Sequence, residues 1–86
     1  MSRPYKTSKN LDRILKKLNK KDKQRYENII NKMNEILNDL DMEHYKNLKE
    51  YKIIHVGSFV LLFKYDKNND FVYFTDFYHH DKIYKY

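Results

Sequence analysis

Apolar residues near the start of the chain repeat at the spacing of an amphipathic helix. Four leucine and isoleucine residues keep the i, i+3, i+4, i+7 spacing of one helical face: Leu11, Ile14, Leu15 and Leu18. Ser8 precedes them and is a residue type favoured at the N-cap. The pattern predicts a first helix over about residues 8–19.

A second helical stripe follows the polar segment 19–22. Its apolar positions again keep the helical period: Tyr26, Ile29, Ile30, Met33, Ile36, Leu37 and Leu40. Asp22 is suited to cap this helix, which we expect over about residues 22–40. Two amphipathic helices joined by so few residues predict an antiparallel helix hairpin.

The period changes to that of β-strands in the second half of the chain. Segment 41–48 has no period, but residues 51–56 are rich in β-branched and aromatic types. Residues 59–65 form an almost unbroken apolar run, which predicts a central strand covered on both faces. Residues 71–78 predict a third strand after the polar turn 66–70.

These elements predict one α+β domain over residues 1–86, with the N-terminal antiparallel helix hairpin packed on a small antiparallel sheet. Residues 3–7 fit a short edge strand or a loose arm, since Pro4 favours either place. The tail 79–86 is polar and basic. Gly57 is the only glycine, which argues against folds that cradle phosphates with a glycine-rich loop.

Composition narrows the chemistry. The chain has no cysteine, which excludes disulfides, thiolate catalysis and zinc sites built on sulfur, and favours a reducing cytoplasm. No apolar run approaches the roughly 20 residues of a membrane span, and the first residues do not resemble a signal peptide. We therefore expect a cytoplasmic protein with no membrane partner.

Positive charge is concentrated at one end of the sequence. Residues 1–25 carry ten Lys or Arg and two Asp, a net charge of +8, whereas residues 26–86 carry eight Lys and ten Asp or Glu, a net charge of −2. Such a one-sided field favours polyanions such as RNA, DNA or an acidic protein. The alternative is a solvated lysine-rich helix face.

Three histidines are the candidate catalytic residues. His55 lies in a predicted strand, His80 follows the third strand, and His44 precedes the first. Imidazole both accepts and donates protons near neutral pH, as metal-free RNA cleavage requires. Strand alternation puts His55 on the face with Tyr51 and Ile53, and we expect that face to form an open basin holding all three histidines. Structural roles for them are the alternative, and a zinc site built from them is less favoured because no ligand spacing supports it.

Basic and aromatic side chains complete the candidate site. Lysines near the predicted strands would neutralise phosphate: Lys49, Lys52 and Lys82. Lysines of the first helix would follow an RNA backbone: Lys16, Lys17 and Lys20. Tyr84 would stack on a base or donate to phosphate, unless it only fixes the tail to the sheet.

Four segments carry a family resemblance: Lys16-Lys17-Leu18, Tyr51-Lys52-Ile53-Ile54-His55-Val56, Val60-Leu61-Leu62-Phe63-Lys64-Tyr65 and His80-Asp81-Lys82-Ile83-Tyr84. In sequence and spacing they resemble the RelE/ParE superfamily of type II toxin–antitoxin toxins, and in particular its YafQ-like branch. The resemblance covers nearly the whole chain. It implies a ribosome-dependent endoribonuclease that cuts mRNA without a metal or other cofactor and is inhibited by a cognate antitoxin.

The resemblance also implies roles for the histidines. In that branch the histidines matching His55 and His80 belong to the active site, and a loop histidine takes part whose nearest counterpart is His44. Relatives of the RelE type have arginines at the positions of Val60 and His80, and the YafQ-like aspartate corresponds to Ser58. The retained histidines favour an mRNA-cleaving toxin. The alternative is a binding module, either a gyrase inhibitor of the ParE type or a small RNA-binding protein.

Overall fold

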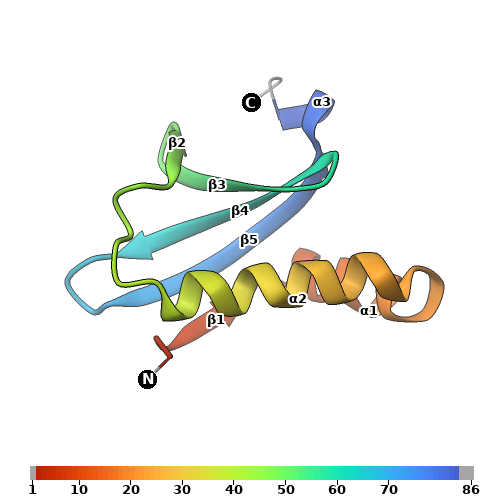
Figure 1. Ribbon diagram of the computed structural model, residues 1–86, viewed down its shortest axis with the longest axis horizontal. Helices are drawn as coiled ribbons and strands as arrows, with labels where there is room; N and C mark the ends of the chain where they lie inside the picture. The colour runs from red at the N-terminus through yellow and green to blue at the C-terminus, as the bar shows by residue number, and fades with distance from the viewer. Residues whose placement is uncertain (1, 84–86) are drawn as a thin grey trace.

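The computed structural model describes the backbone of residues 2–83 and the side chains of residues 2–81 (Figure 1). Its elements are β1 (Tyr5–Thr7), α1 (Lys9–Lys21), α2 (Lys23–Asn38), β2 (Lys46–Leu48), β3 (Tyr51–Val56), β4 (Phe59–Asp66), β5 (Phe71–His79) and α3 (His80–Ile83). The architecture is α+β, as the sequence predicts. Within the described residues, no helix is both long enough and apolar enough to cross a membrane.

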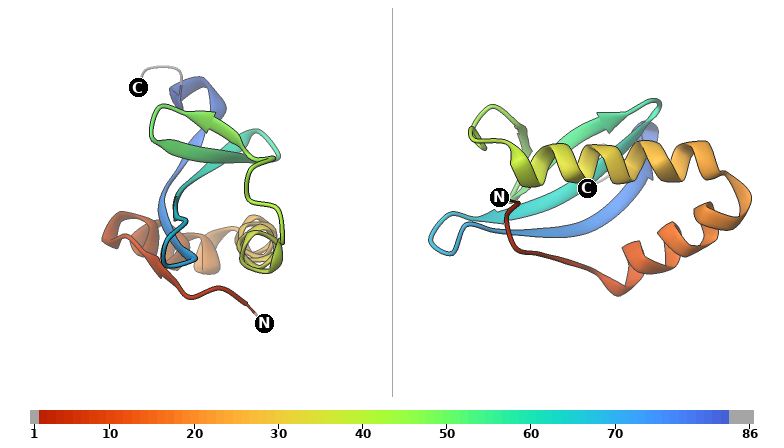
Figure 2. Two further views of the ribbon diagram at one scale, coloured as in Figure 1. Left: turned by 90° about the vertical axis from the view of Figure 1, so that its left-hand side faces the viewer. Right: turned by 60° about the horizontal axis from the view of Figure 1, so that its bottom comes forward.

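The two long helices begin and end close to the predicted positions because their caps are local. The Oγ atom of Ser8 accepts a hydrogen bond from the backbone N–H of Leu11 at 3.0 Å, which starts α1. Asp22 ends α1 and caps α2, with its carboxylate accepting from the N–H of Arg25 at 3.2 Å. The helices meet at this residue and diverge from it, with α2 running along the sheet (Figure 2).

The sheet is larger and less regular than predicted. It has five strands in the order β1-β5-β4-β3-β2, and β1 pairs in parallel with β5 while the other pairs are antiparallel. The prediction of a wholly antiparallel sheet is therefore wrong. Segment 46–48, which has no sequence period, forms β2, and residues 5–7 form the edge strand β1. The start of the predicted tail, residues 80–83, forms α3.

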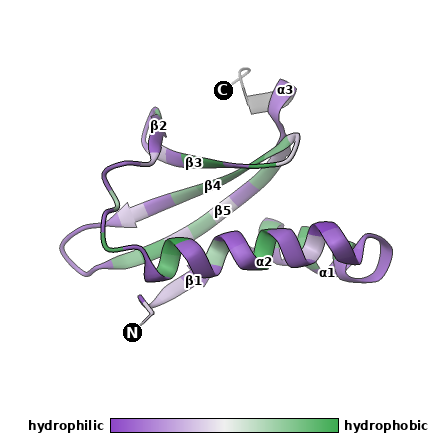
Figure 3. Cartoon of the chain, in the orientation of Figure 1, coloured by the Kyte–Doolittle hydropathy of each residue, from purple (hydrophilic) through white to green (hydrophobic). Residues whose placement is uncertain are grey.

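The main core lies between the helices and one face of the sheet. Leu11 of α1 and Ile29 of α2 pack with Leu61 and Phe63 of β4, and all four side chains are fully buried. Apolar residues accordingly lie along β3, β4 and β5, whereas the helices are mostly hydrophilic with apolar positions on the packed side (Figure 3). Burial of this apolar stripe is what stabilises helices of this length.

The opposite face of the sheet carries a second, smaller core. Val60 and Leu62 of β4 are almost completely buried there and pack with Ile53 of β3. Three partly buried side chains surround them: Leu48, Tyr51 and Tyr78. This face is therefore closed in part by apolar packing, and the expectation of an open basin across three strands is wrong. The apolar run of β4 is covered on both sides, as its sequence predicts.

Candidate active site

His55 and His80 come together at one end of the sheet. His55 pairs with Val60 across the β3–β4 ladder, and Val60 pairs with Tyr78 across the β4–β5 ladder. Immediately after β5, the backbone N–H of His80 donates to the carbonyl of Ser58 in the β3–β4 turn at 3.0 Å. Strand register thus brings two histidines, 25 residues apart in the sequence, to the same turn. Figure 1 shows α3, which begins at His80, next to this turn.

His55 is exposed and forms part of a groove beside α2. Its neighbours in β3, Ile54 and Val56, pack in the helix-side core, so alternation turns His55 away from that core. The open groove has a volume of about 370 Å³. Its lining is mostly polar: Asn28, Asn31, Lys32, Glu35, His55, Val56 and Gly57. His55 is therefore reachable by a ligand and is not a buried structural residue.

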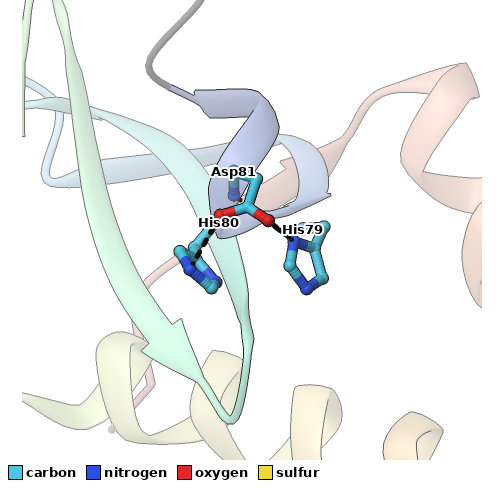
Figure 4. A group of neighbouring side chains, drawn as sticks. All are labelled: His79, His80 and Asp81. Carbon is cyan, nitrogen blue, oxygen red and sulfur yellow. Dashed lines mark hydrogen bonds and ion pairs between the residues drawn. The ribbon is translucent and has the colours of Figure 1, made fainter.

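His80 is anchored through one ring nitrogen. Its Nδ1 atom lies 3.0 Å from the carbonyl oxygen of Ser58, while its Nε2 atom lies 3.0 Å from a carboxylate oxygen of Asp81. The adjacent His79 has its Nδ1 atom 3.4 Å from the other oxygen of that carboxylate, so Asp81 faces both rings (Figure 4). His79 therefore belongs to this cluster, although its sequence predicts only the start of a polar tail.

An aromatic stack supports the cluster from the helix side. The ring of Phe59 is stacked on that of Phe77, with the two centroids 5.0 Å apart. The ring of His79 packs edge-on against the ring of Phe59, with the centroids 5.3 Å apart. Arg25 of α2 places its guanidinium 4.3 Å from the centroid of Phe59. Arg25 thus brings a positive charge to the histidine end of the sheet, a placement that depends on tertiary packing and has no local sequence signal.

His44 is not part of this arrangement. Its Nε2 atom lies 2.6 Å from the carboxylate of Asp39, just past the C-terminus of α2, and its ring packs on that of Tyr45 with centroids 4.1 Å apart. His55 and His80 lie instead by the β3–β4 turn, where Arg25 near the N-terminus of α2 contacts Phe59. The structure therefore does not bring His44 to the β3–β4 turn with His55 and His80, because His44 is bound to Asp39 beyond the C-terminus of α2.

Hydrogen bonds perturb the acid–base behaviour of this second cluster. The bonds from His44 and Tyr45 hold the pKa of Asp39 well below its ordinary value. In return, the bond to Asp39 raises the pKa of His44 above its ordinary value. Burial, together with the hydrogen bond to Asp39, raises the pKa of Tyr45. Tyr45 is almost fully buried and packs edge-on against Phe63, so the pair is attached to the core.

The predicted phosphate-binding lysines of the strands do not join the histidines. Lys49 lies in the turn before β3, and Lys52 donates to the side chain of Asn47 in β2 at 3.2 Å. Both lie towards the start of β3, whereas His55 lies near its end. The side chains of Lys82 and Tyr84 lie outside the described residues.

The basic helix α1 is a separate surface. Its side chains at Lys16, Lys17 and Lys20 are exposed, and none of them forms an ion pair within the described part of the chain. Asp12 is the only acidic residue of α1, and it accepts a hydrogen bond from Thr7. This helix therefore carries many more positive than negative side chains.

Comparison with known proteins gives the family. The chain is 49% identical over 80 residues to a Methanocaldococcus jannaschii protein named putative toxin RelE4, an alignment that covers 87% of this chain and 83% of that protein. It is also 42% identical over 79 residues to an uncharacterized protein of Methanosarcina mazei, covering 86% and 90%. No family model and no solved structure matches.

Both alignments cover more than four fifths of this chain and of the related protein. At this identity and coverage, the chain belongs to the RelE family of toxins.

Proposed function

We propose that this protein is the toxin of a toxin–antitoxin pair and acts as an mRNA-cleaving endoribonuclease on the ribosome. The observation that carries the proposal is that His55 and His80 both lie at the β3–β4 turn. Membership of the RelE family supports the toxin role and implies a cognate antitoxin. The retained histidines His55 and His80 support our proposal that this protein belongs to the YafQ-like branch of the family.

The proposed reaction needs two proton transfers. One imidazole takes the proton of the ribose 2′-hydroxyl as its oxygen attacks the adjacent phosphorus, and the other gives a proton to the departing 5′-oxygen. The P–O5′ bond breaks as the P–O2′ bond forms, leaving a 2′,3′-cyclic phosphate and a 5′-hydroxyl. His55 is exposed beside a groove, and the side chain of His80, which Ser58 orients, is 44% exposed, so both rings are accessible. His44 is left out because Asp39 engages it.

Charge on two elements supports binding of the RNA. Arg25, whose guanidinium also pairs with Asp22 at 3.2 Å, lies at the histidine end of the sheet and would help to balance the negative charge that develops on phosphorus. The unpaired lysines of α1, namely Lys16, Lys17 and Lys20, would contact more distant phosphates of mRNA or ribosomal RNA. These lysines also support the second candidate function, a toxin that binds RNA and blocks it without cutting.

Expression in a bacterial host tests the proposal. The wild-type protein should stop growth and produce cleaved messages, detectable by mapping 5′ ends of cellular RNA. His55→Ala and His80→Ala should each restore growth, whereas His44→Ala should remain toxic. Toxicity that persists in the His55→Ala, His80→Ala double variant, with messages intact, would support the binding toxin instead.

A further inference from the structure

The cluster of His79, His80 and Asp81 has the geometry of a small metal site. Each residue offers one ligand atom, and the three atoms lie within 4.8 Å of one another. A zinc ion bound at about 2.0–2.1 Å needs tetrahedral ligands roughly 3.3 Å apart. The nitrogen-to-carboxylate distances, 3.4 Å from His79 to one oxygen of Asp81 and 3.0 Å from His80 to the other, are close to that spacing. In Figure 4 the two rings lie on either side of the Asp81 carboxylate, and each ring is joined to one of its oxygens.

Hydrogen bonding orients electron pairs, not protons, towards the centre of this cluster. The Nδ1 atom of His80 faces the carbonyl oxygen of Ser58 at 3.0 Å, and a carbonyl only accepts, so Nδ1 must carry the proton. In a neutral ring this leaves the lone pair on Nε2, the atom that faces Asp81. A backbone carbonyl holding the other ring nitrogen is the usual outer partner of a metal-bound histidine.

His79 is oriented in the same way. Its Nδ1 atom accepts a hydrogen bond from the backbone N–H of Asp81 at 3.3 Å, so that nitrogen also carries a lone pair in this arrangement. It lies 3.4 Å from a carboxylate oxygen, which is another electron-pair donor. Two imidazole lone pairs and a carboxylate facing one another repel unless protons or a metal cation lie between them.

We propose that His79, His80 and Asp81 bind a divalent transition-metal ion, with zinc as the expected ligand. Two imidazoles and one carboxylate suit zinc and leave a fourth position for water. Magnesium prefers oxygen ligands in octahedral geometry and should not bind here. The side chains are 39%, 44% and 75% exposed, so an ion can reach them.

An occupied site would also restrain the toxin, a consequence that rests on the proposed function. An imidazole of His80 whose lone pair is held by zinc is not available for proton transfer. Zinc would therefore act as an inhibitor of cleavage and not as its cofactor. The binding claim stands apart from this consequence, because it is measured without RNA.

Isothermal titration of the purified full-length chain with zinc, and with magnesium in parallel, tests the site. We expect saturable 1:1 zinc binding and none for magnesium. Loss of an outer partner alone weakens metal sites by about 10–100-fold, so His79→Ala, His80→Ala and Asp81→Asn should each weaken zinc binding by about 100-fold or more. His44→Ala is the matched control and should bind like the wild type, since His44 pairs with Asp39 outside the cluster.

Three outcomes would overturn the metal site. The first is that the wild type shows no saturable zinc binding. The second is that the His79→Ala, His80→Ala double variant binds zinc as tightly as the wild type. The third is that His44→Ala no longer binds zinc. Circular dichroism of each variant shows that it is folded. A chain that binds zinc but never cleaves RNA would retain the site and refute the proposed function, whereas a chain that cleaves RNA but binds no zinc would do the reverse.

Discussion

Truncation of Leu62 tests whether the second face of the sheet is as closed as its packing implies. Leu62 is 1% exposed and packs with Ile53 and Val60, although the helices lie on the other face. Leu→Ala changes at buried sites lower the free energy of unfolding by about 2–5 kcal/mol, which combines lost transfer energy with the cavity left behind. A domain of this length has roughly 4–13 kcal/mol in total, so the loss is a large fraction of it.

Two other leucines give matched comparisons for the same chemical change. Leu61, the neighbour of Leu62 in β4, is 0% exposed in the helix-side core, whereas Leu40 is 97% exposed. In urea unfolding followed by circular dichroism, a loss of about 3 kcal/mol lowers the midpoint by about 1–3 M. We expect shifts of this size for Leu61→Ala and Leu62→Ala. Leu40→Ala should change the free energy of unfolding by no more than about 0.5 kcal/mol.

The three leucine variants together show whether the second face is closed. If Leu62→Ala shifted the midpoint as little as Leu40→Ala while Leu61→Ala shifted it strongly, the second face would be open in solution. Val60 and Leu62 would then not be held in a second core with Ile53.

Two further predictions concern charge. The pKa of His44 is raised in the folded protein, so protonation of His44 stabilises the fold. This stabilisation is complete below the unfolded pKa of about 6.5 and is lost as the pH rises through the folded pKa. In urea unfolding, His44→Ala should therefore lower the free energy of unfolding more at about pH 5.5 than at about pH 8.5. A larger cost at the higher pH would contradict the ion pair with Asp39. Separately, charge reversal to Glu at Lys16, Lys17 and Lys20 should weaken RNA binding and flatten its salt dependence in filter-binding assays, and an unchanged salt slope would mean that this helix face is only solvated.

Local signals made most of the fold predictable. Ser8 and Asp22 cap the helices at their expected places, because caps act through backbone groups within one turn. The apolar run of β4 marked a strand covered on both faces. By contrast, β2 has only three residues and is mostly polar, so its sequence does not indicate a strand. It becomes a strand because it pairs with β3.

The parallel strand β1 and the histidine cluster show why the remainder escaped prediction. Tyr5 pairs with Val72, far along the chain, and nothing in a three-residue strand reveals the direction of its partner. The approach of His80 to Ser58 likewise depends on the register of β4 and β5, which includes an irregularity between Leu62 and Phe63. The presence of histidines in the sequence indicated acid–base chemistry. Which groups they contact, however, depends on strand register and tertiary packing.

Product analysis of cleaved mRNA tests the central claim most directly. Purified protein would be added to ribosomes translating a defined message, with a chelator that removes transition metals and leaves magnesium for the ribosome. We predict cleavage that persists under the chelator and leaves a 2′,3′-cyclic phosphate and a 5′-hydroxyl. The rate should fall by roughly 10²–10⁴-fold in His55→Ala and in His80→Ala, but stay near wild type in His44→Ala. Fragments ending in a 3′-hydroxyl and a 5′-phosphate, or full activity in the His55→Ala, His80→Ala double variant, would contradict histidine catalysis.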